Sequence, residues 1–301
     1  MAGETSHRTL PRTRKPTPAA ALRGGVSERS SIDSVAPRDR RGAGRKPSAE
    51  MVWLASYPRS GNTWLRFLLY AYFQGAARES QEMESRIPNL HRGNIDRAWA
   101  HDPTLGKTHL SWDERHPYRR ETRGCIYLIR HPKDVLLSNL NYFKLQGGVV
   151  DDRIFALDFI RCGGVPWWRV EMGSWDGHAS SWIEASSLHR LVIRYEVMKA
   201  KPHAALARVI EFLGLEPAAA RIASAVRDCE LPRLRELEIE ERQARRGTLF
   251  PGGFERLEAG RYFFDRAAVG QDLTCIGDDL DEIFDRRFDD SLYLLDAAED
   301  L

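Results

Sequence analysis

Cysteine is scarce in this 301-residue chain, and its four cysteines are widely spaced. Cys125, Cys162, Cys229 and Cys275 form no Cys-x-x-Cys pair, which argues against a zinc or redox centre and suits a reducing cytoplasm. Carboxylate-rich metal loops are absent as well. We therefore expect neither a metal site nor disulfide bonds.

Long apolar runs are also absent. None approaches the roughly 20 residues that a helix needs to cross a bilayer. The start of the chain has no apolar core of the kind found in signal peptides. These absences favour a cytoplasmic protein without a membrane partner.

Aromatic residues are missing from residues 1–49, which are rich in Arg, Ser, Pro, Ala and Gly. Such a segment cannot bury enough apolar surface to offset the entropy of ordering, so we predict a disordered basic tail. Three alternatives remain open for this tail. It contacts nucleic acid or acidic lipid, it is a targeting peptide, or it has no function.

Positive charge is in excess only at this end of the chain. Residues 1–50 hold 11 Lys/Arg and 5 Asp/Glu, whereas residues 51–301 hold 34 and 38. The predicted domain, residues 50–301, is therefore no general binder of polyanions, and any positive potential in it must be local. We expect no nucleic-acid partner.

Apolar runs and helical patterns alternate along the rest of the chain. The segments 52–55, 104–110, 125–129 and 191–193 predict strands. Helices are predicted after the first strand and over 135–143, 175–186, 202–215, 218–229, 231–242 and 277–287. The alternation predicts a single α/β domain with a parallel sheet flanked by helices, and with ligands at the carboxyl ends of the strands.

The stretch from Gln146 to Gly173 interrupts this pattern. It contains two Gly-Gly pairs and is predicted to be irregular, which is typical of a lid or of a wall of a substrate site. Trp167 and Trp168 either flank the acceptor or anchor the loop.

Residues 51–71 are predicted to form a strand, a tight loop and a helix. A helix N-terminus carries unpaired N–H groups and positive dipole charge, so a loop over it suits an anion. Arg59 supplies charge, Ser60 and Thr63 supply hydroxyl groups, and Gly61 permits close approach of the backbone. The loop is not the GxxxxGK[ST] phosphate loop, and by itself it would also fit an ordinary strand–turn–helix connection.

Read together with distant segments, this loop resembles the sulfotransferases that use 3′-phosphoadenylyl sulfate (PAPS). Its sequence is similar to their 5′-phosphosulfate loop, and the other similar segments are Lys107-Thr-His-Leu110, Tyr127 to Ser138, Gly173-Ser-Trp175 with Trp182, and Arg194-Tyr-Glu196. The resemblance covers residues 51–215 well and 216–301 weakly. Within the family, the first strand and loop look closest to bacterial sulfotransferases of small molecules such as glycopeptide antibiotics.

The resemblance implies a P-loop-like fold and a set of site residues. Lys107, His109 and Arg59 would be catalytic. The co-substrate would be bound by Arg59, Ser60, Gly61, Asn62, Thr63, Trp64, Arg130, Ser138, Tyr195 and Arg266. Arg130 and Ser138 would hold the 3′-phosphate, whereas Trp64 either stacks on adenine or belongs to the core.

These residue types suit sulfuryl transfer. A free histidine has a pKa of about 6.5, so neutral His109 is available as a general base. Arg59 and the backbone N–H groups of the loop would stabilise charge on the leaving phosphate. A sulfuryl group carries less charge than a phosphoryl group, so fixed cations suffice without a metal.

The chain also departs from the family pattern. Arg59 stands where the common loop has Lys, and the usual Arg-Lys-Gly element near the C-terminus is missing. Phe263 to Gly270 occupies its place, with Arg266 or Arg261 as the remaining phosphate contact.

The sequence therefore predicts a sulfotransferase that transfers a sulfuryl group from PAPS to a hydroxyl of a small-molecule acceptor. A homodimer is compatible with it. Two alternatives remain, a magnesium-dependent phosphotransferase or nucleotide kinase, and a noncatalytic nucleotide-binding module.

Overall fold

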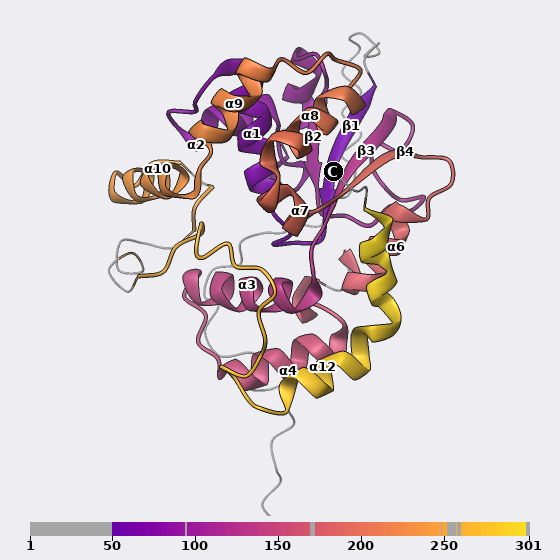
Figure 1. Cartoon of the computed structure of the whole chain (residues 1–301), viewed down its shortest axis with the longest axis vertical. Helices are drawn as coiled ribbons and strands as arrows, with labels where there is room; N and C mark the ends of the chain where they lie inside the picture. The colour runs from indigo at the N-terminus through magenta and orange to yellow at the C-terminus, as the bar shows by residue number, and fades with distance from the viewer. Residues whose placement is uncertain are drawn as a thin grey trace, which may run out of the picture. The chain divides into compact units, whose positions relative to one another are not determined.

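A four-stranded parallel sheet lies at the centre of the chain in the computed structural model, which describes residues 50–93, 95–168, 172–247, 249–251, 257 and 260–298 (Figure 1). The tail predicted over residues 1–49 lies outside this part. The strands are β1 (Met51–Ser56), β2 (Leu105–Thr108), β3 (Thr122–Ile129) and β4 (His189–Arg194), in the order β2-β1-β3-β4. The predicted α/β class with a parallel sheet is confirmed.

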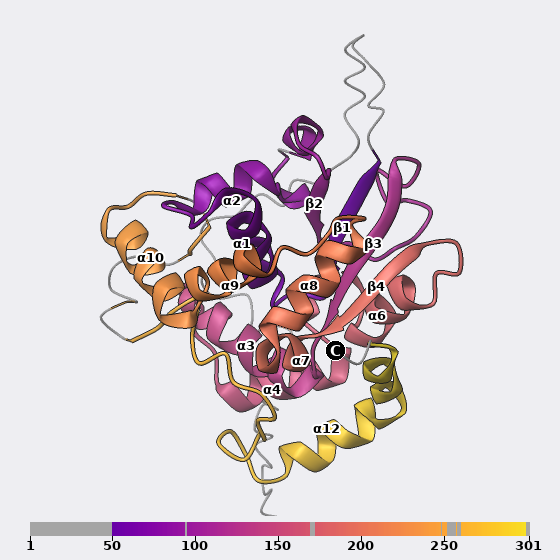
Figure 2. The same ribbon diagram turned by 45° about the horizontal axis from the view of Figure 1, so that its top comes forward.

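Side chains of β1 alternate between two apolar cores. Val52 and Leu54 pack in the first core with α1 (Asn62–Gln74), α8 (Pro202–Phe212) and α9 (Ala219–Asp228). Figures 1 and 2 both show α9 beside α1. Met51, Trp53 and Ala55 pack in the second core. Strands buried on both faces explain the unbroken apolar runs in the sequence.

The second core contains residues of α3 (Pro132–Leu145), α4 (Asp152–Cys162), α6 (Trp175–Ile183) and α12 (Leu280–Phe288). Figure 1 shows α12 side by side with α4. The remaining elements are α2 (Ser80–Arg86), α7 (Tyr195–Ala200), α10 (Leu231–Gln243) and the 3₁₀ segments η2 (Leu90–Arg92), η3 (Ile95–Ala100), η4 (Pro166–Trp168) and η5 (Asp289–Ala297). The predicted helices are thus present, with ends shifted by a few residues.

The irregular structure predicted from Gln146 to Gly173 is wrong, because α4 occupies its middle. The side chain of Asp151 caps this helix by accepting a hydrogen bond from the backbone N–H of Ile154 at 3.1 Å. Gly163, with φ of 69°, ends it. The first glycine of a Gly-Gly pair therefore marks a helix end rather than a loop.

Trp167 follows α4 and packs against two phenylalanine rings. Its ring centroid lies 5.3 Å from that of Phe143 and 5.7 Å from that of Phe155. These contacts favour the anchoring role for Trp167, although 43% of the residue is exposed. The side chain of Trp168 lies outside the described part of the chain.

The carboxyl ends of the four strands lie level with one another. Ala55 pairs with Thr108, Ser56 with Leu128, and Ile129 with Arg194. Four of the segments that the sequence singled out for chemistry lie where these strands end, whereas Gly173-Ser-Trp175 lies at the start of α6. The sheet therefore brings four distant parts of the sequence to one edge.

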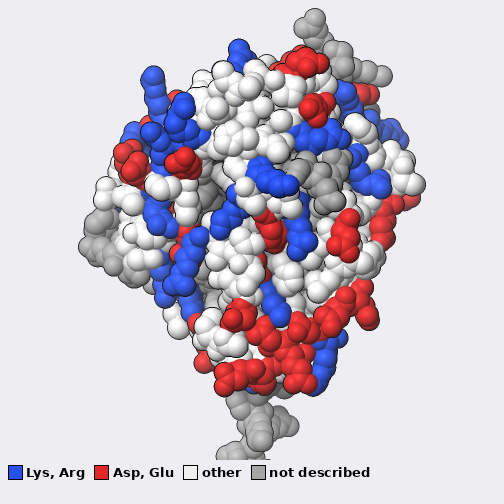
Figure 3. All heavy atoms as spheres, in the orientation of Figure 1, with Lys and Arg blue, Asp and Glu red and all other residues white. Residues whose placement is uncertain are grey.

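Acidic side chains gather on the face shown in Figure 3, over α12 and η5. The acidic residues of these elements are Asp281, Glu282, Asp285, Asp289, Asp290 and Asp296. Among the helices that the structure describes, none combines the length and the apolar character needed to cross a membrane.

Candidate active site

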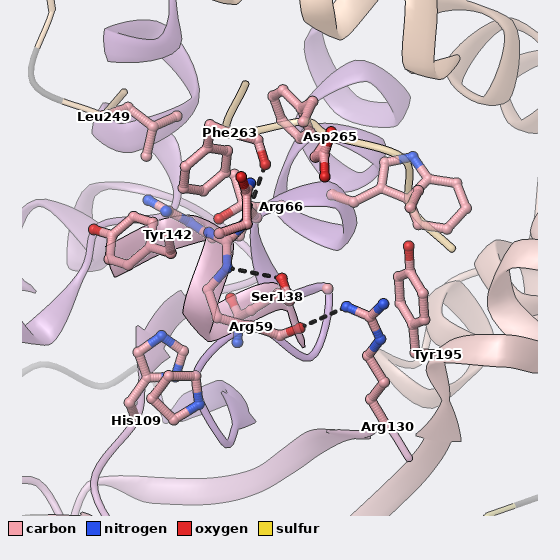
Figure 4. Close-up of a pocket in the computed structure, with 18 of the residues that line it drawn as sticks. Arg59, Arg66, His109, Arg130, Ser138, Tyr142, Tyr195, Leu249, Phe263 and Asp265 are labelled. Carbon is pink, nitrogen blue, oxygen red and sulfur yellow. Dashed lines mark hydrogen bonds between the residues drawn. The ribbon is translucent and has the colours of Figure 1, made fainter. Parts of the chain in front are cut away.

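A cavity of about 310 Å³ lies at the carboxyl edge of the sheet (Figure 4). Ten predicted site residues and one of the two C-terminal candidates line it: Arg59, Gly61, Asn62, Thr63, Trp64, Lys107, His109, Arg130, Ser138, Tyr195 and Arg266. Ser60 is the exception, because it is fully buried and does not contribute to the wall. The fold thus brings together nearly all of the predicted residues.

Gly61 shapes the loop between β1 and α1. Its φ is 96°, and a Cβ atom there would lie 2.5 Å from Cδ2 of Tyr195. Only glycine fits this backbone without displacing the ring. Helix α1 begins at the next residue, so its first N–H groups and the positive end of its dipole lie at the cavity.

The side chain of Asn62 folds the loop back onto β1. Its Nδ2 donates to the carbonyl oxygen of Leu54 at 2.9 Å and to Oγ of Ser56 at 3.2 Å. The amide group therefore holds the loop in shape. Trp64 lines the cavity and also packs against the first core, and its Nε1 donates to the carbonyl oxygen of Cys229 at 3.0 Å.

Arg59 is a cation held in a fixed position (Figure 4). Its Nε donates to Oγ of Ser138 at 3.2 Å, and its Nη2 donates to the carbonyl oxygen of Phe263 at 3.1 Å. Its guanidinium lies over the rings of Phe263 and Tyr142, 4.3 and 4.8 Å from their centroids. Burial lowers its pKa to about 10, so the charge remains at neutral pH.

The backbone of Arg59 is unusual, because its φ is 73° in a residue that has a Cβ atom. Such conformations are costly and cluster at sites of function. Here it directs the guanidinium across the cavity toward Ser138 on α3.

Arg130 directly follows β3 and crosses to the same loop. Its Nη1 donates to the carbonyl oxygen of Arg59 at 3.0 Å, and its Nη2 donates to that of Ala268 at 2.8 Å. The guanidinium lies 4.4 Å from the ring centroid of Tyr195 (Figure 4). Its buried Nε has no hydrogen-bond partner. In the described part of the chain, no carboxylate oxygen lies within 4.0 Å of the guanidinium nitrogens of Arg130. These contacts give no support to simple pairing with an acidic neighbour.

Hydrogen bonds of its ring and of its backbone orient His109. Its Nδ1 lies 2.7 Å from the carbonyl oxygen of Ser56, which can only accept, so Nδ1 carries the proton and Nε2 keeps its lone pair. The backbone N–H of His109 donates to Nε2 of His91 at 2.9 Å. Its carbonyl oxygen accepts from Nε2 of His178 at 3.0 Å.

The pKa of His109 is lowered well below its usual 6.5, chiefly by burial and then by Lys107 and His91. The neutral imidazole is therefore the form present at neutral pH. A base with a fixed tautomer and a free lone pair is suited to accept a proton.

Lys107 is a buried amine beside other cations. Burial and the charges of Arg66 and Arg92 lower its pKa well below 10.5. Among the described residues, none places a carboxylate within 4.0 Å of its Nζ. An anion in the cavity would favour the charged form of this amine.

The segment from Arg261 to Gln271 crosses the cavity in place of the Arg-Lys-Gly element, and we call it the strap. Glu238 on α10 accepts hydrogen bonds from the backbone N–H groups of Phe263 and Phe264, at 2.6 and 2.9 Å. Asp134 on α3 accepts from those of Gly270 and Gln271, at 3.0 and 3.2 Å. Two buried carboxylates thus hold the strap at both ends.

The strap distinguishes the two candidates for a C-terminal phosphate contact. Arg266 lines the cavity and is exposed. Arg261 does not line it, and its carbonyl oxygen accepts from Nη1 of Arg242 at 3.0 Å. The position of Arg266 therefore favours it over Arg261.

Several residues of the site were missed by sequence reasoning. They are Asp134, Tyr142, His91, His178 and Glu238. Tyr142 stands four residues after Ser138 on α3, so helical spacing would have indicated it. Asp134 lies within the segment Tyr127 to Ser138, and His178 lies between Trp175 and Trp182, but neither was singled out there. His91 and Glu238 lie far from the motifs and are placed by tertiary packing.

Comparison with known proteins places the chain in a family. Residues 49–293 match the model of the sulfotransferase domain. Cytosolic sulfotransferase 8 of Arabidopsis thaliana is 26% identical over 241 residues, which cover 71% of each chain. Sulfotransferase 1E1 of Homo sapiens is 30% identical over 179 residues, covering 54% of this chain and 59% of that protein.

Solved structures agree on the fold. Mouse sulfotransferase SULT7A1 complexed with PAP superposes with a TM-score of 0.61 at 20% identity, covering 82% of this chain and 84% of that one. Retinol dehydratase in complex with androsterone and PAP gives 0.59 at 18% identity, over 83% and 82%. The chain belongs to the sulfotransferase domain family, which confirms the predicted class, a PAPS-dependent sulfotransferase.

Proposed function

We propose that this protein transfers a sulfuryl group from PAPS to a hydroxyl of a small molecule, with His109 as general base and without a metal. The observation that carries the proposal is the bond between Nδ1 of His109 and the carbonyl oxygen of Ser56. It leaves Nε2 of the base unprotonated in the cavity that Arg59 also lines.

The donor set fits a ligand with two anionic groups. Arg59, the start of α1 and Lys107 would hold the phosphosulfate, whereas Arg130, Ser138 and Arg266 would hold the 3′-phosphate. The unpartnered Nε of Arg130 is a buried donor of the kind that a phosphate oxygen satisfies. Tyr195 would lie near the adenine.

The transfer would proceed by in-line displacement. The acceptor oxygen forms its bond to sulfur while its proton passes to Nε2 of His109. The bond between sulfur and the phosphate oxygen breaks, and its electron pair leaves with PAP. Arg59 and the N–H groups of α1 would stabilise the charge that develops on that oxygen.

Relatives support the substrate classes. PAP is present in the structures of SULT7A1 and of retinol dehydratase, and androsterone is bound to the latter. By analogy, we expect a small-molecule acceptor here. The curated relatives in Arabidopsis are named cytosolic, and we propose the cytoplasm as the location of this protein too.

Substitution of the base tests the proposal. His109→Ala should abolish sulfuryl transfer from PAPS in an acceptor screen, while calorimetry should still detect binding of PAP. His203→Ala, at an exposed position of α8, is the matched control and should retain full activity. Near-normal turnover by His109→Ala would exclude His109 as the base.

A second pair of measurements separates sulfuryl from phosphoryl transfer. Turnover with PAPS should persist in excess EDTA, and PAP should bind more tightly than ATP. Tighter binding of ATP together with loss of turnover in EDTA would favour the phosphotransferase alternative.

A further inference from the structure

His91 lies in η2, which packs beside the end of β2. The backbone N–H of Lys107 donates to the carbonyl oxygen of Pro88 at 2.8 Å, and Asn89 pairs with Lys107 as a parallel bridge. Asn89 also caps η2, because its Oδ1 accepts from the backbone N–H of His91 at 3.2 Å. These bonds place the ring of His91 next to that of His109, with centroids 5.7 Å apart.

The two ring nitrogens of His91 have different roles. Nε2 accepts the hydrogen bond from the backbone N–H of His109, so in the neutral ring the proton resides on Nδ1. Burial, and then the charge of Lys107, lower the pKa of His91 to about 3, so the ring is neutral at physiological pH.

The Nδ1–H group of His91 has no acceptor among the described residues, and the residue lines the cavity. A half-buried N–H group that meets apolar substrate surface loses its hydrogen bond to water, which is unfavourable. An oxygen of the acceptor would restore that bond.

The surrounding wall is polar as well. Asn89 and Arg92 line the cavity beside His91, and Lys107 lies next to them. Arg92 forms an ion pair with Glu84 at 2.8 Å, so this wall holds charged and polar groups rather than an apolar slot. Such a wall suits an acceptor that carries oxygen atoms around the reacting hydroxyl.

We propose that His91 determines acceptor specificity: its Nδ1–H binds an oxygen on the carbon next to the one that carries the reacting hydroxyl, while its Nε2 positions the base. The preferred acceptors are therefore vicinal diols, catechols and related molecules with two adjacent oxygens. This inference rests on the proposed function, because it assumes that a hydroxyl is sulfated at His109.

Matched acceptors test the specificity. Turnover of PAPS is measured with catechol against phenol, and with 1,2-cyclohexanediol against cyclohexanol. The member of each pair that has the adjacent oxygen should show a kcat/KM about tenfold higher or more, since a site built for a hydrogen bond rejects an analogue that lacks it.

Two variants separate the roles of the ring nitrogens. The amide of Gln reaches the position of Nε2, so His91→Gln keeps an acceptor for the His109 N–H and loses the donor at Nδ1. The amide of Asn reaches the position of Nδ1, so His91→Asn does the reverse. We expect His91→Gln to lose the preference within each pair, and His91→Asn to keep the preference while kcat falls.

Binding of PAP and thermal unfolding are measured for the wild-type protein and both variants. Equal rates within each pair, or a preference that persists in His91→Gln, would overturn the inference. If PAP binds and no acceptor of the panel is sulfated, the inference also fails, whereas the nucleotide-binding half of the proposed function stands. Failure of the wild-type protein to bind PAP would instead overturn the proposed function.

Discussion

Nδ1 of His109 lies 2.7 Å from the carbonyl oxygen of Ser56, the last residue of β1. The anion-binding loop starts at the following residue, so one strand end both fixes the tautomer of the base and begins the loop that carries Arg59. In the proposed reaction, the base and the leaving-group contacts would thereby share one frame, which would reduce the reorganisation needed during transfer.

The lowered pKa of His109 predicts an unusual pH dependence. Burial, Lys107, His91 and His178 all lower this pKa, whereas the bond to Ser56 raises it. A base is active in its neutral form, so activity is present above the pKa and lost as the pH falls through it. We expect kcat/KM for PAPS to stay constant as the pH falls through 6.5 and to decline only under more acidic conditions. Thermal unfolding at each pH serves as the control, and an acid limb centred at or above 6.5 in a folded enzyme would contradict the prediction.

Arg59 is expected to act in the transition state rather than only in binding. Arg59→Gln removes its charge and should lower kcat by about 100-fold or more, the range found when a group that stabilises developing charge is removed. Arg59 also donates to the carbonyl oxygen of Phe263, so the variant loosens the strap as well.

Arg235→Gln is the matched control for that second effect. Arg235 donates to the carbonyl oxygen of Phe264 at 3.0 Å but does not line the cavity. We expect it to raise KM for PAPS with little change in kcat. Equal losses of kcat in Arg59→Gln and Arg235→Gln would show that Arg59 acts by holding the strap in place and not through its charge in the transition state.

Features held by interactions between residues close in the sequence could be predicted, whereas features held by contacts between distant residues could not. The parallel sheet and the segments at its edge were predictable because buried strands and strand–turn–helix links have local patterns. The helix α4 was missed because the Gly-Gly pair outweighed its apolar positions, although Asp151 and Gly163 are caps of ordinary kind.

The polar contacts that complete the site were not predictable in the same way. His91 reaches His109 across 18 positions, and Glu238 reaches Phe263 across 25. No spacing rule links such pairs, because tertiary packing alone brings them together. The strap is the clearest case, since its backbone carbonyl groups contact Arg59 and Arg130 and side-chain patterns carry no signal for them.

Gly61 is required on two separate grounds, which substitution can distinguish. Gly61→Ala combines a φ of 96° with a contact of 2.5 Å to Tyr195. Gly93→Ala is the matched control, because its backbone is left-handed as well (φ 70°, ψ 11°) and nothing lies within 4 Å of the new Cβ atom. Both should lose about 1 kcal/mol of unfolding free energy from the backbone conformation. Only Gly61→Ala should lose more unfolding free energy than that, and only Gly61→Ala should weaken PAP binding in calorimetry. Equal effects of the two variants would show that the ring of Tyr195 moves to accommodate the new Cβ atom.

Glu238 is the buried anchor of the strap, and its charge should matter for both stability and binding. It is fully buried, accepts two backbone N–H bonds from the strap and lies 2.8 Å from Nη1 of Arg242. Glu238→Gln replaces charge-assisted bonds by weaker ones in a low-dielectric setting, so we expect a loss of about 3 kcal/mol in unfolding free energy.

The matched control for this prediction is Glu282→Gln, which removes a similar pair four residues apart with Arg286 at an exposed position of α12. Denaturant unfolding should detect no change in it, because water screens exposed pairs. Since the strap carries Phe263, whose carbonyl oxygen holds Arg59, Glu238→Gln should also raise KM for PAPS, whereas Glu282→Gln should not. A variant at Glu238 that is destabilised yet binds PAPS normally would show that the strap keeps its position without this carboxylate, and Asp134 would then be its main anchor.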